Sequence, residues 1–370
     1  MFTPAVIHAR VIAAAPAPQP PLLTVAIPHY KQWRYLEVVL ASLFTQHFDD
    51  FEIVVSDDAS PDESLERLPA ILQAGGRPFR YYRQPTNLGY DGNVRFCLAA
   101  AQGRYVMLLG NDDALANADT LTEIAAALAA LQYPAVAFTN HAPWDAPEQV
   151  VRRAVQTTQL GRGPTAALGC FRALSFVSGV LFSQAAAAQF DTDAWDGSVF
   201  YQIYLGCRII AAGGAVAGLA VTAIHKDVRI AGVGVPTYAT KARREVDWRP
   251  RETGLGTIAR LVMVALGPFV APPQRSRMMR QVMQQVLLIS YPYWLLEYRR
   301  VAHWSWSWGV ARRLWPAHWV FDDRLRWHDR VWLWLEYVVV TVIGLVVPVS
   351  LFVRLRTSAA LFVRRLQQRR

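Results

Sequence analysis

Apolar runs and amphipathic stretches alternate through roughly the first 140 residues of the chain. In the amphipathic stretches apolar positions recur every three to four residues, the spacing of one buried helix face. In the first of them, these positions are Leu36, Val39, Leu40 and Leu43. We expect strands at 22–28, 51–57, 79–84, 104–110 and 135–140, and further helices at 61–73, 91–101 and 118–131. Apolar strands that alternate with helices predict an α/β fold with a mostly parallel, Rossmann-like sheet and helices on both faces.

Beyond residue 140 the pattern changes twice. Residues 141–240 are irregular, with Gly/Ala-rich stretches and a polar segment, FDTDAWDGS. Helical apolar runs follow from about Lys241, then a Trp/Arg-rich stretch, then the run WLWLEYVVVTVIGLVVPVSLFV and a basic tail. The predicted organisation has four parts: a disordered Ala/Pro lead-in (1–21), the α/β domain (22–240), a helical Trp/Arg-rich interfacial region (241–331), and a hydrophobic membrane segment with a basic amphipathic tail (332–370).

Charge and tryptophan are concentrated in the C-terminal part. Residues 241–370 contain 22 Lys and Arg against 8 Asp and Glu, and ten of the thirteen tryptophans. The formal net charge is therefore −4 for residues 1–240 and +14 for the remainder, within a total of +10. Arginine with tryptophan suits an anionic, partly apolar surface such as a bilayer interface. Single-stranded nucleic acid is the competing partner, and the long apolar runs between the arginines argue against it.

The run 332–353 is long enough to cross a bilayer as a helix, since 22 residues extend about 33 Å. Arginines flank it on both sides, and six of them lie in the tail after residue 353. A single crossing would place one basic flank outside, against the positive-inside tendency. Gly344 and Pro348 offer a break. We therefore favour a re-entrant or monotopic anchor with both ends cytoplasmic over a simple span.

The three cysteines, Cys97, Cys170 and Cys207, are odd in number, widely spaced and set in apolar sequence. This pattern indicates buried thiols in a reducing compartment, not a disulfide framework or a metal site.

Acidic residues follow two of the predicted strands. Asp57 and Asp58 come after FEIVVS, and Asp112 and Asp113 after YVMLLGN. Ligands of parallel sheets bind beyond the carboxyl ends of the strands, and paired carboxylates hold Mg²⁺ or Mn²⁺ with a diphosphate completing the coordination. No glycine-rich phosphate loop accompanies them, so a nucleotide here would need a cation. Taken alone, Asn-Asp-Asp after a strand is most often turn chemistry and a helix cap.

Two blocks of sequence resemble family 2 glycosyltransferases of the GT-A fold. The stretch TVAIPHYKQWRYLEVVLASLFTQHFDDFEIVVSDDASPDES has that family's Pro-x-Tyr strand end and Asp-Asp-x-Ser strand end. NLGYDGNVRFCLAAAQGRYVMLLGNDDAL is similar to its next block, with an Asn-x-Gly loop and an Asp-x-Asp-type metal motif. The Gly-x-Asp-Asp form looks like that of abequosyl- and rhamnosyltransferases of bacterial surface polysaccharide assembly. The resemblance is strong over residues 22–115, weak over 116–240 and absent beyond.

The resemblance implies roles for the matching residues. Pro28 and Tyr30 would line the base pocket, and Asp58 would hydrogen-bond the nucleobase. Asp113 would be the principal ligand of Mg²⁺ or Mn²⁺, and Asp112 would lie near the ribose or the metal. The remaining predicted nucleotide-binding positions are Asn87, Gly89 and Asn93. This chain has Asn111 where the family usually has the first aspartate, and Arg95 stands two residues after Asn93 where the family commonly has Ala-Arg-Asn.

The family's catalytic base lies about 80 residues after the metal motif, and FDTDAWDGS is the acidic cluster at that distance. It offers Asp196, our first choice, with Asp193 and Asp191 as runners-up. The usual Glu-Asp pair is missing, so solvated loop aspartates are an equal alternative.

A cationic segment, AIHKDVRIAGVG, supplies His225, Lys226 and Arg229 after an apolar run. One of these side chains could contact the diphosphate as it leaves. A structural histidine is the simpler interpretation of His225.

These features predict an inverting, metal-dependent glycosyltransferase. It would move a sugar from a nucleotide diphosphate sugar to a polyprenyl-diphosphate-linked glycan, in the synthesis of O-antigen, capsule or exopolysaccharide. We expect membrane lipids but not nucleic acid as partners, and a location on the cytoplasmic face of the bacterial inner membrane. Two alternatives stay open: a nucleotidyltransferase on the same fold, and a non-catalytic membrane-bound scaffold with a degenerate transferase domain.

Overall fold

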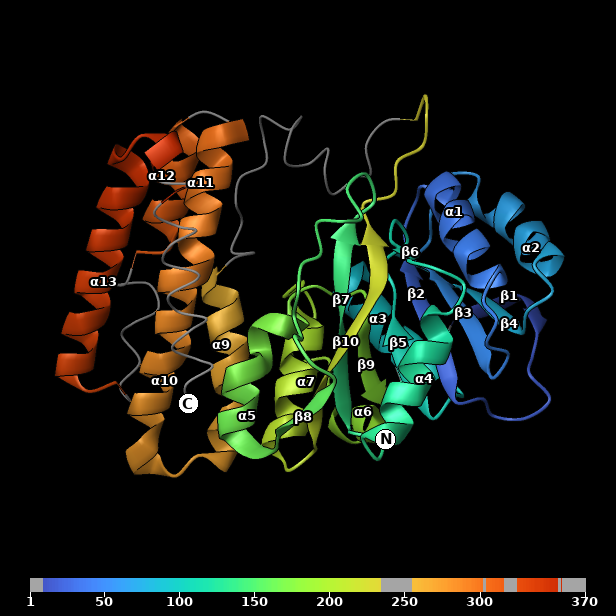
Figure 1. The fold of residues 1–370 in the computed structure, drawn as a ribbon, viewed down its shortest axis with the longest axis horizontal. Coiled ribbons are helices and arrows are strands. Elements are labelled where there is room, and N and C mark those ends of the chain that lie inside the picture. Colours follow the sequence, from blue (N-terminus) through green and yellow to red (C-terminus); the bar gives the residue numbers. More distant parts are fainter. Residues whose placement is uncertain (1–8, 234–254, 302–303, 316–324, 352–353, 355–370) are drawn as a thin grey trace. The chain divides into compact units, whose positions relative to one another are not determined.

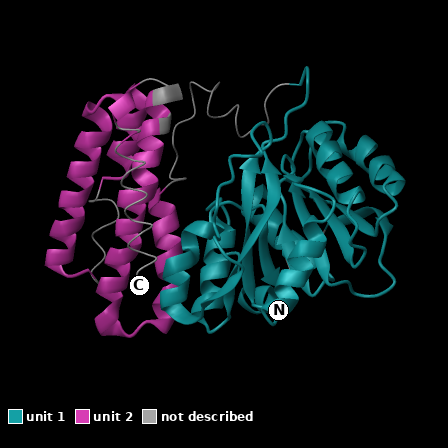
Figure 2. Ribbon diagram, in the orientation of Figure 1, with its two compact units in different colours: residues 1–237 teal, residues 238–370 magenta. Residues whose placement is uncertain are grey.

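The computed structural model describes the chain in five parts: residues 9–233, 255–301, 304–315, 325–351 and 354. The chain divides into two compact units, residues 1–237 and 238–370 (Figure 2). The predicted boundary at residue 240 lies outside the described residues.

Unit 1 is built on one sheet in the order β1-β4-β3-β2-β5-β9-β7-β10-β6, with β8 beside β10 (Figure 1). Its strands are β1 (Arg10–Ala15), β2 (Leu23–His29), β3 (Phe51–Asp57), β4 (Phe79–Arg83), β5 (Tyr105–Leu108), β6 (Ala114–Leu115), β7 (Val136–Pro143), β8 (Thr158–Gly161), β9 (Val180–Ser183) and β10 (Val216–Lys226). The strands expected from the apolar runs are present as β2, β3, β4, β5 and β7.

The sheet is mixed, so the prediction of a mostly parallel sheet was wrong. Strands β4, β3, β2 and β5 are parallel neighbours, as are β7 and β10. Strand β9 runs antiparallel between β5 and β7, and β1, β6 and β8 also pair antiparallel. The parallel half is where the predicted acidic strand ends lie, and parallel strands bring their carboxyl ends to one edge.

The predicted disordered lead-in is also wrong in part, because residues 10–15 form β1. This strand pairs antiparallel with β4 from Arg10 opposite Arg83 to Ala15 opposite Phe79. It gives β4 a second neighbour, so its hydrogen-bonding groups are not left at an open edge.

Helices cover both faces of the sheet, as predicted. They are α1 (Trp33–Phe44), α2 (Ser64–Ala74), α3 (Gly89–Ala100), α4 (Thr120–Ala130), α5 (Gly163–Cys170), α6 (Gln184–Phe190) and α7 (Tyr201–Ala211), with a short 3₁₀ turn at Phe171–Leu174. Helices α1, α2 and α4 bury apolar side chains in one core with β2, β3 and β5. Helix α3 lies on the other face, where α6 and α7 contact it.

Unit 2 is helical. Its elements are α9 (Leu255–Leu266), a 3₁₀ turn (Gly267–Phe269), α10 (Pro272–Gln285), a π-helical turn (Val286–Ser290), α11 (Tyr291–Val301), α12 (Trp304–Arg313) and α13 (Trp327–Val346). Helix α13 passes through Gly344, where a Cβ atom would come within 2.5 Å of Leu295 Cδ1. It ends before Pro348, because a residue that precedes proline avoids the helical conformation, and Val347 is extended at φ −65°, ψ 136°. Of the two predicted breaks, the structure therefore uses Pro348.

No helix among the described residues combines the length and the apolar character that crossing a bilayer requires. The predicted basic tail lies outside the described residues except for Arg354.

Candidate functional site

The carboxyl ends of β2, β3 and β5 meet at one edge of the sheet. The Asp58 amide donates to the His29 carbonyl over 2.8 Å, which joins β3 to β2. The Asn111 side-chain amide donates to the Lys31 carbonyl at 3.2 Å and to His29 Nδ1 at 3.1 Å. Asn111 thus fastens the end of β5 to the end of β2.

Asp112 and Asp113 lie side by side just beyond β5, as predicted. Asp113 is 5% exposed, and its carboxylate accepts hydrogen bonds from Ser178 Oγ (2.5 Å) and from the Asp227 amide (2.9 Å). Asp112 is partly exposed, and its carboxylate is hydrogen-bonded by its own backbone amide. A Cβ atom on Gly110 would lie 3.0 Å from Asp113 Oδ2 and 3.2 Å from Asp112 Oδ1. Glycine at position 110 therefore leaves room for both carboxylates on the same side of the turn.

The surroundings of this pair disfavour its negative charge. Burial, followed by the charges of Asp113 and Asp227, raises the pKa of Asp112 to about 7. Burial also raises the pKa of Asp113 to about 6, although the bonds from Ser178 and the Asp227 amide oppose it. A cation beside the two carboxylates would remove this penalty.

These residues fit a divalent cation whose remaining ligands come from the substrate. Within the part of the chain that the structure describes, no three His, Cys, Asp or Glu side chains are grouped so that they could hold a metal ion. Mg²⁺ is commonly bound by one or two carboxylates together with substrate phosphates and water, and Asp112 and Asp113 can supply the carboxylates.

Ser178 was not predicted, and it is held by a guanidinium that was not predicted either. Arg153 donates to the carbonyl oxygens of Ala173 (3.0 Å), Phe176 (2.8 Å) and Ser178 (2.9 Å). Burial lowers the pKa of Arg153, and the charge of Asp113 opposes that shift. The loop that carries the donor to Asp113 is therefore fixed by a single arginine.

The predicted cationic segment at the end of β10 runs past the aspartate pair. The Asp227 amide bonds Asp113, and the Val228 amide donates to the Asp112 carbonyl at 2.8 Å. Lys226 Nζ lies 2.6 Å from Asp227 Oδ2, and Arg229 is exposed.

His225 pairs with Ala114 across β10 and β6 and lies edge-on to Trp144, with ring centroids 6.4 Å apart. Burial lowers the pKa of His225, which favours the neutral ring. Lys226 and Arg229 are the segment's charged candidates.

Of the two residues predicted to line the base pocket, Tyr30 has an accessible aromatic ring. Tyr30 is 42% exposed, and Lys31 Nζ lies 4.9 Å from the centre of its ring. Pro28 is partly buried at the end of β2. Lys31 and Gln32 have φ values of 62° and 68°, a conformation that non-glycine residues adopt only when the surroundings hold them.

His29 and Asp62 supply that hold, and neither was predicted. The Gln32 amide donates to Asp62 Oδ2 at 2.6 Å, and Ser64 Oγ lies 2.5 Å from Asp62 Oδ1 and 2.8 Å from His29 Nε2. Because the Asn111 amide can only donate to Nδ1, the proton of neutral His29 is on Nε2. Burial lowers the pKa of His29 to about 4, which keeps it neutral. The sequence offered one indication of this role, because His29 is the middle residue of the Pro-His-Tyr motif.

Two of the predicted nucleotide-binding residues, Asp58 and Asn93, are buried and hydrogen-bond to the protein interior instead of facing solvent at the carboxyl ends of the strands. Asp58 is 2% exposed, and its carboxylate accepts the amides of Leu88 (2.6 Å) and Gly89 (3.0 Å). Asn93 is buried and bonds Ser56 through both ends of its side-chain amide. Both residues thus position the start of α3 against β3, which is a supporting role.

The loop before α3 lies over Asp58 and is more accessible. Asn87 is exposed, its side-chain amide donates to the Asp58 carbonyl at 3.3 Å, and its Oδ1 accepts the Gly89 amide at 3.0 Å. Gly89 has a φ of +75°, which favours glycine at this turn.

The acidic segment after α6 is fastened to α3 by Arg95. The guanidinium of Arg95 is 3% exposed and binds Asp191 through Nε (2.8 Å) and Nη2 (2.9 Å). Its Nη1 binds Asp196 Oδ2 at 3.0 Å. Asp91, also on α3, accepts the amides of Val199 (2.7 Å) and Tyr201 (3.0 Å) at the start of α7. Arg95 and Asp91 therefore fix the segment from both ends.

This geometry separates the three candidate bases. The Asp191 side chain is 1% exposed and accepts a further hydrogen bond from Tyr201 at 2.7 Å, so it is a structural partner of Arg95 and not an accessible base. Asp193 is exposed in the loop. The Asp196 side chain is 34% exposed, and only its Oδ2 is bonded to Arg95. Burial raises the pKa of Asp196, and Arg95 opposes that shift.

Part of the chain is similar to known glycosyltransferases. Residues 24–163 match the model of glycosyl transferase family 2. The chain is 38% identical over 98 residues to the abequosyltransferase RfbV of Salmonella typhimurium, which covers 26% of this chain and 29% of that protein. It is 33% identical over 95 residues to the GalNAc(5)-diNAcBac-PP-undecaprenol beta-1,3-glucosyltransferase of Campylobacter jejuni, which covers 26% of this chain and 31% of that protein. These alignments thus span about three tenths of each curated relative.

Among solved structures, residues 1–349 of S. aureus TarS in complex with UDP are similar, with a TM-score of 0.56. The identity is 15%, and the match covers 87% of this chain and 88% of that one. The likeness shows that the fold is shared.

Proposed function

Starting from a chain that carries a family 2 glycosyltransferase domain, we propose that this protein transfers a sugar from a nucleotide diphosphate sugar to a hydroxyl group of a lipid-linked glycan. The observation that carries the proposal is the pair Asp112 and Asp113 at the carboxyl end of β5, inside the matched residues. Asp113 is buried and Asp112 is partly exposed, and both have raised pKa values; two such adjacent carboxylates are costly to keep unless a cation and a phosphate use them.

Asp113 and Asp112 would hold Mg²⁺ or Mn²⁺, which supplies positive charge to neutralise the departing diphosphate. Ser178 and the Asp227 amide keep the Asp113 carboxylate oriented. Lys226 and Arg229 add positive charge beside the pair, where a diphosphate develops its negative charge. The exposed ring of Tyr30 offers a flat apolar surface for the nucleobase.

Asp196 is our proposed base. The acceptor oxygen forms a bond to the anomeric carbon while the bond from that carbon to the diphosphate oxygen breaks, and the hydroxyl proton passes to the carboxylate. Attack on the face opposite the leaving group inverts the anomeric centre. Arg95 orients Asp196 through Oδ2 and leaves Oδ1 available for the proton.

A lipid-linked acceptor is supported by the name of the Campylobacter relative, which acts on a glycan joined to PP-undecaprenol. The abequosyltransferase name supports a deoxyhexose as one candidate donor sugar. Such an acceptor would place the protein at the cytoplasmic face of the inner membrane, as the sequence predicts.

Product analysis tests the proposal against its two rivals. The full-length protein is incubated with Mn²⁺, UDP-, GDP-, dTDP- and CDP-sugars, and a short-chain polyprenyl-diphosphate-linked sugar. A glycosyltransferase releases nucleoside diphosphate and lengthens the acceptor. A parallel reaction with nucleoside triphosphates and sugar 1-phosphates tests for a nucleotidyltransferase, which would release pyrophosphate there. Nucleotide binding without turnover in either reaction identifies the scaffold.

A further inference from the structure

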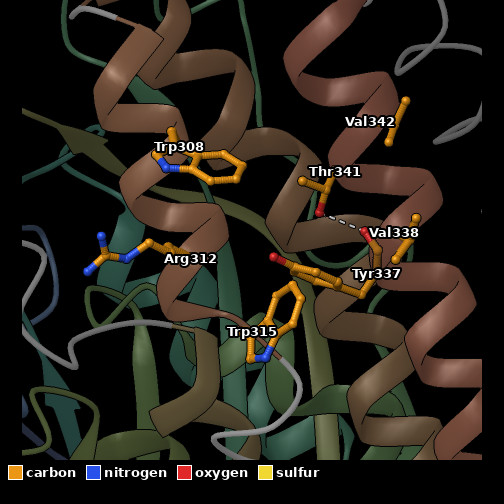
Figure 3. A pocket seen from close by; sticks show the side chains of 7 residues that line it. All are labelled: Trp308, Arg312, Trp315, Tyr337, Val338, Thr341 and Val342. Atoms are coloured by element: carbon orange, nitrogen blue, oxygen red, sulfur yellow. Dashed lines mark hydrogen bonds between the residues drawn. The ribbon is translucent and has the colours of Figure 1, made fainter.

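A pocket of about 540 Å³ lies in unit 2 between α12 and α13, and its volume suits a small ligand or a single hydrocarbon chain. Trp308, Arg312 and Trp315 line it from α12 and the residues just after it. Tyr337, Val338, Thr341 and Val342 line it from α13. The rings of Trp308, Trp315 and Tyr337 point into the space between the two helices (Figure 3).

The polar groups at the base of the pocket are satisfied within unit 2. Tyr337 Oη donates to the Ala311 carbonyl at 2.7 Å. Thr341 Oγ1 donates to the Tyr337 carbonyl at 2.6 Å (Figure 3). It also lies 2.9 Å from Tyr291 Oη. These groups need no ligand atom, so the pocket favours an apolar occupant.

The apolar lining continues onto the outer face of α13. The buried positions of this helix recur at Asp329, Leu333, Tyr337 and Thr341. The opposite face is exposed and apolar over several turns, and its members include Val331, Leu335, Val338, Val339, Val342 and Val346. An exposed apolar face of this length marks a surface that another apolar body covers.

The charged residues of α12 and α13 indicate which kind of apolar surface covers this face. Both carboxylates of α13 are bonded to α10: Asp329 to Ser276 (2.8 Å) and Arg280 (3.1 Å), and Glu336 to Gln284 (2.5 Å). Neither therefore faces outward with the valines. Arg312 is exposed, and its guanidinium points away from the rings (Figure 3). An arginine whose stem lines an apolar pocket while its charged end extends away is suited to a lipid phosphate above buried chains.

We propose that the outer faces of α12 and α13 dock on an anionic phospholipid bilayer, with one acyl chain in the pocket and a lipid phosphate at Arg312. Helix α13 then lies in the plane of the membrane–water interface and does not cross the bilayer. Interfacial tryptophans such as Trp308 and Trp315 then sit at the headgroup level. This binding is independent of the proposed sugar transfer.

Vesicle flotation of the full-length protein tests the proposal. We expect binding to vesicles of phosphatidylcholine mixed with phosphatidylglycerol and much weaker binding to phosphatidylcholine alone. The double variant Val338→Ser/Val342→Ser alters side chains that are 44% and 54% exposed, so the fold should survive. Its partition coefficient onto the anionic vesicles should fall at least about tenfold, because the variant no longer gains the free energy of moving two valine side chains out of water. Arg312→Gln should lose about fivefold, and only on the anionic vesicles.

Matched changes in unit 1 provide the controls. Val155→Ser/Leu160→Ser removes two side chains of similar exposure, and Arg162→Gln removes an exposed arginine; neither should alter flotation. Equal binding to both vesicle types, or equal binding by the α13 double variant, overturns the proposal. A wild-type protein that stays in solution with both vesicle types also overturns the proposal. If that protein is a dimer and the α13 double variant is a monomer, a second copy of the chain covers this face instead.

Discussion

Replacing Asp112 by asparagine should stabilise unit 1 when no divalent cation is present. Burial and the neighbouring carboxylates raise the pKa of Asp112 from 3.8 to about 7, whereas in the unfolded chain it titrates near its ordinary value. Between these values the folded state keeps a proton that the unfolded state has lost, so stability falls as pH rises from about 4 to about 7. Three pH units correspond to about 4 kcal/mol. Because the carboxylate is partly exposed, we expect about half of this, about 2 kcal/mol, at pH 8.

Hydrogen exchange of the buried amides in β2, β3 and β5 measures this free energy for unit 1 by itself. In EDTA at pH 8, exchange in Asp112→Asn should be roughly 30-fold slower than in the wild type, and at pH 5 the gain should be less than about 1 kcal/mol. The control Asp145→Asn removes an exposed carboxylate and should change neither value by more than about 0.5 kcal/mol. A gain that does not grow with pH, or an Asp112→Asn variant that is less stable at pH 8, refutes the reasoning.

Three further predictions follow from the residues around the site. Arg95→Gln leaves Asp191 buried without its partner and should lower the unfolding free energy of unit 1 by about 3–5 kcal/mol, measured by the same exchange method, with part recovered in Arg95→Gln/Asp191→Asn. Ser178→Ala removes a 2.5 Å hydrogen bond to the Asp113 carboxylate and should weaken cation-dependent nucleotide binding about tenfold by calorimetry; unchanged affinity would show that Ser178 does not orient Asp113. Because burial raises the pKa of Asp196, kcat should fall as pH falls, with a midpoint above the ordinary value of 3.8; a midpoint at or below that value contradicts Asp196 as the base.

Local pattern was sufficient for the parallel half of unit 1. The predicted strand 51–57 coincides with β3, whose residues are all buried and include the apolar run Ile53, Val54 and Val55. The face predicted for α1 is buried as well. Strands β1 and β9 carry no such signal. Strand β1 (RVIAAA) has mostly small side chains that are exposed or half-buried, and β9 (VLFS) has only four residues. Their pairing depends on β4, β5 and β7, which are remote in sequence, so the mixed character of the sheet could not be predicted.

The same contrast applies to the site. Asp112 and Asp113 are adjacent in the sequence, so their pairing was visible there. Ser178 is 65 residues from Asp113 and Asp227 is 114 residues away, and the fold alone brings them together. Arg95 reaches Asp191 across 96 residues, which explains why the sequence offered Asp191 as a base although it is a buried ion-pair partner.

Calorimetric titration of nucleoside diphosphates tests the central claim that the aspartate pair binds a cation together with a diphosphate. UDP, GDP, dTDP and CDP are titrated into the full-length wild type, Asp113→Asn and the control Asp119→Asn, whose carboxylate is 62% exposed, in Mn²⁺ and in EDTA. We predict that at least one nucleotide binds to the wild type and to Asp119→Asn in Mn²⁺ only, and that Asp113→Asn does not bind it. Equal affinity in EDTA and Mn²⁺, or undiminished binding by Asp113→Asn, would contradict the account.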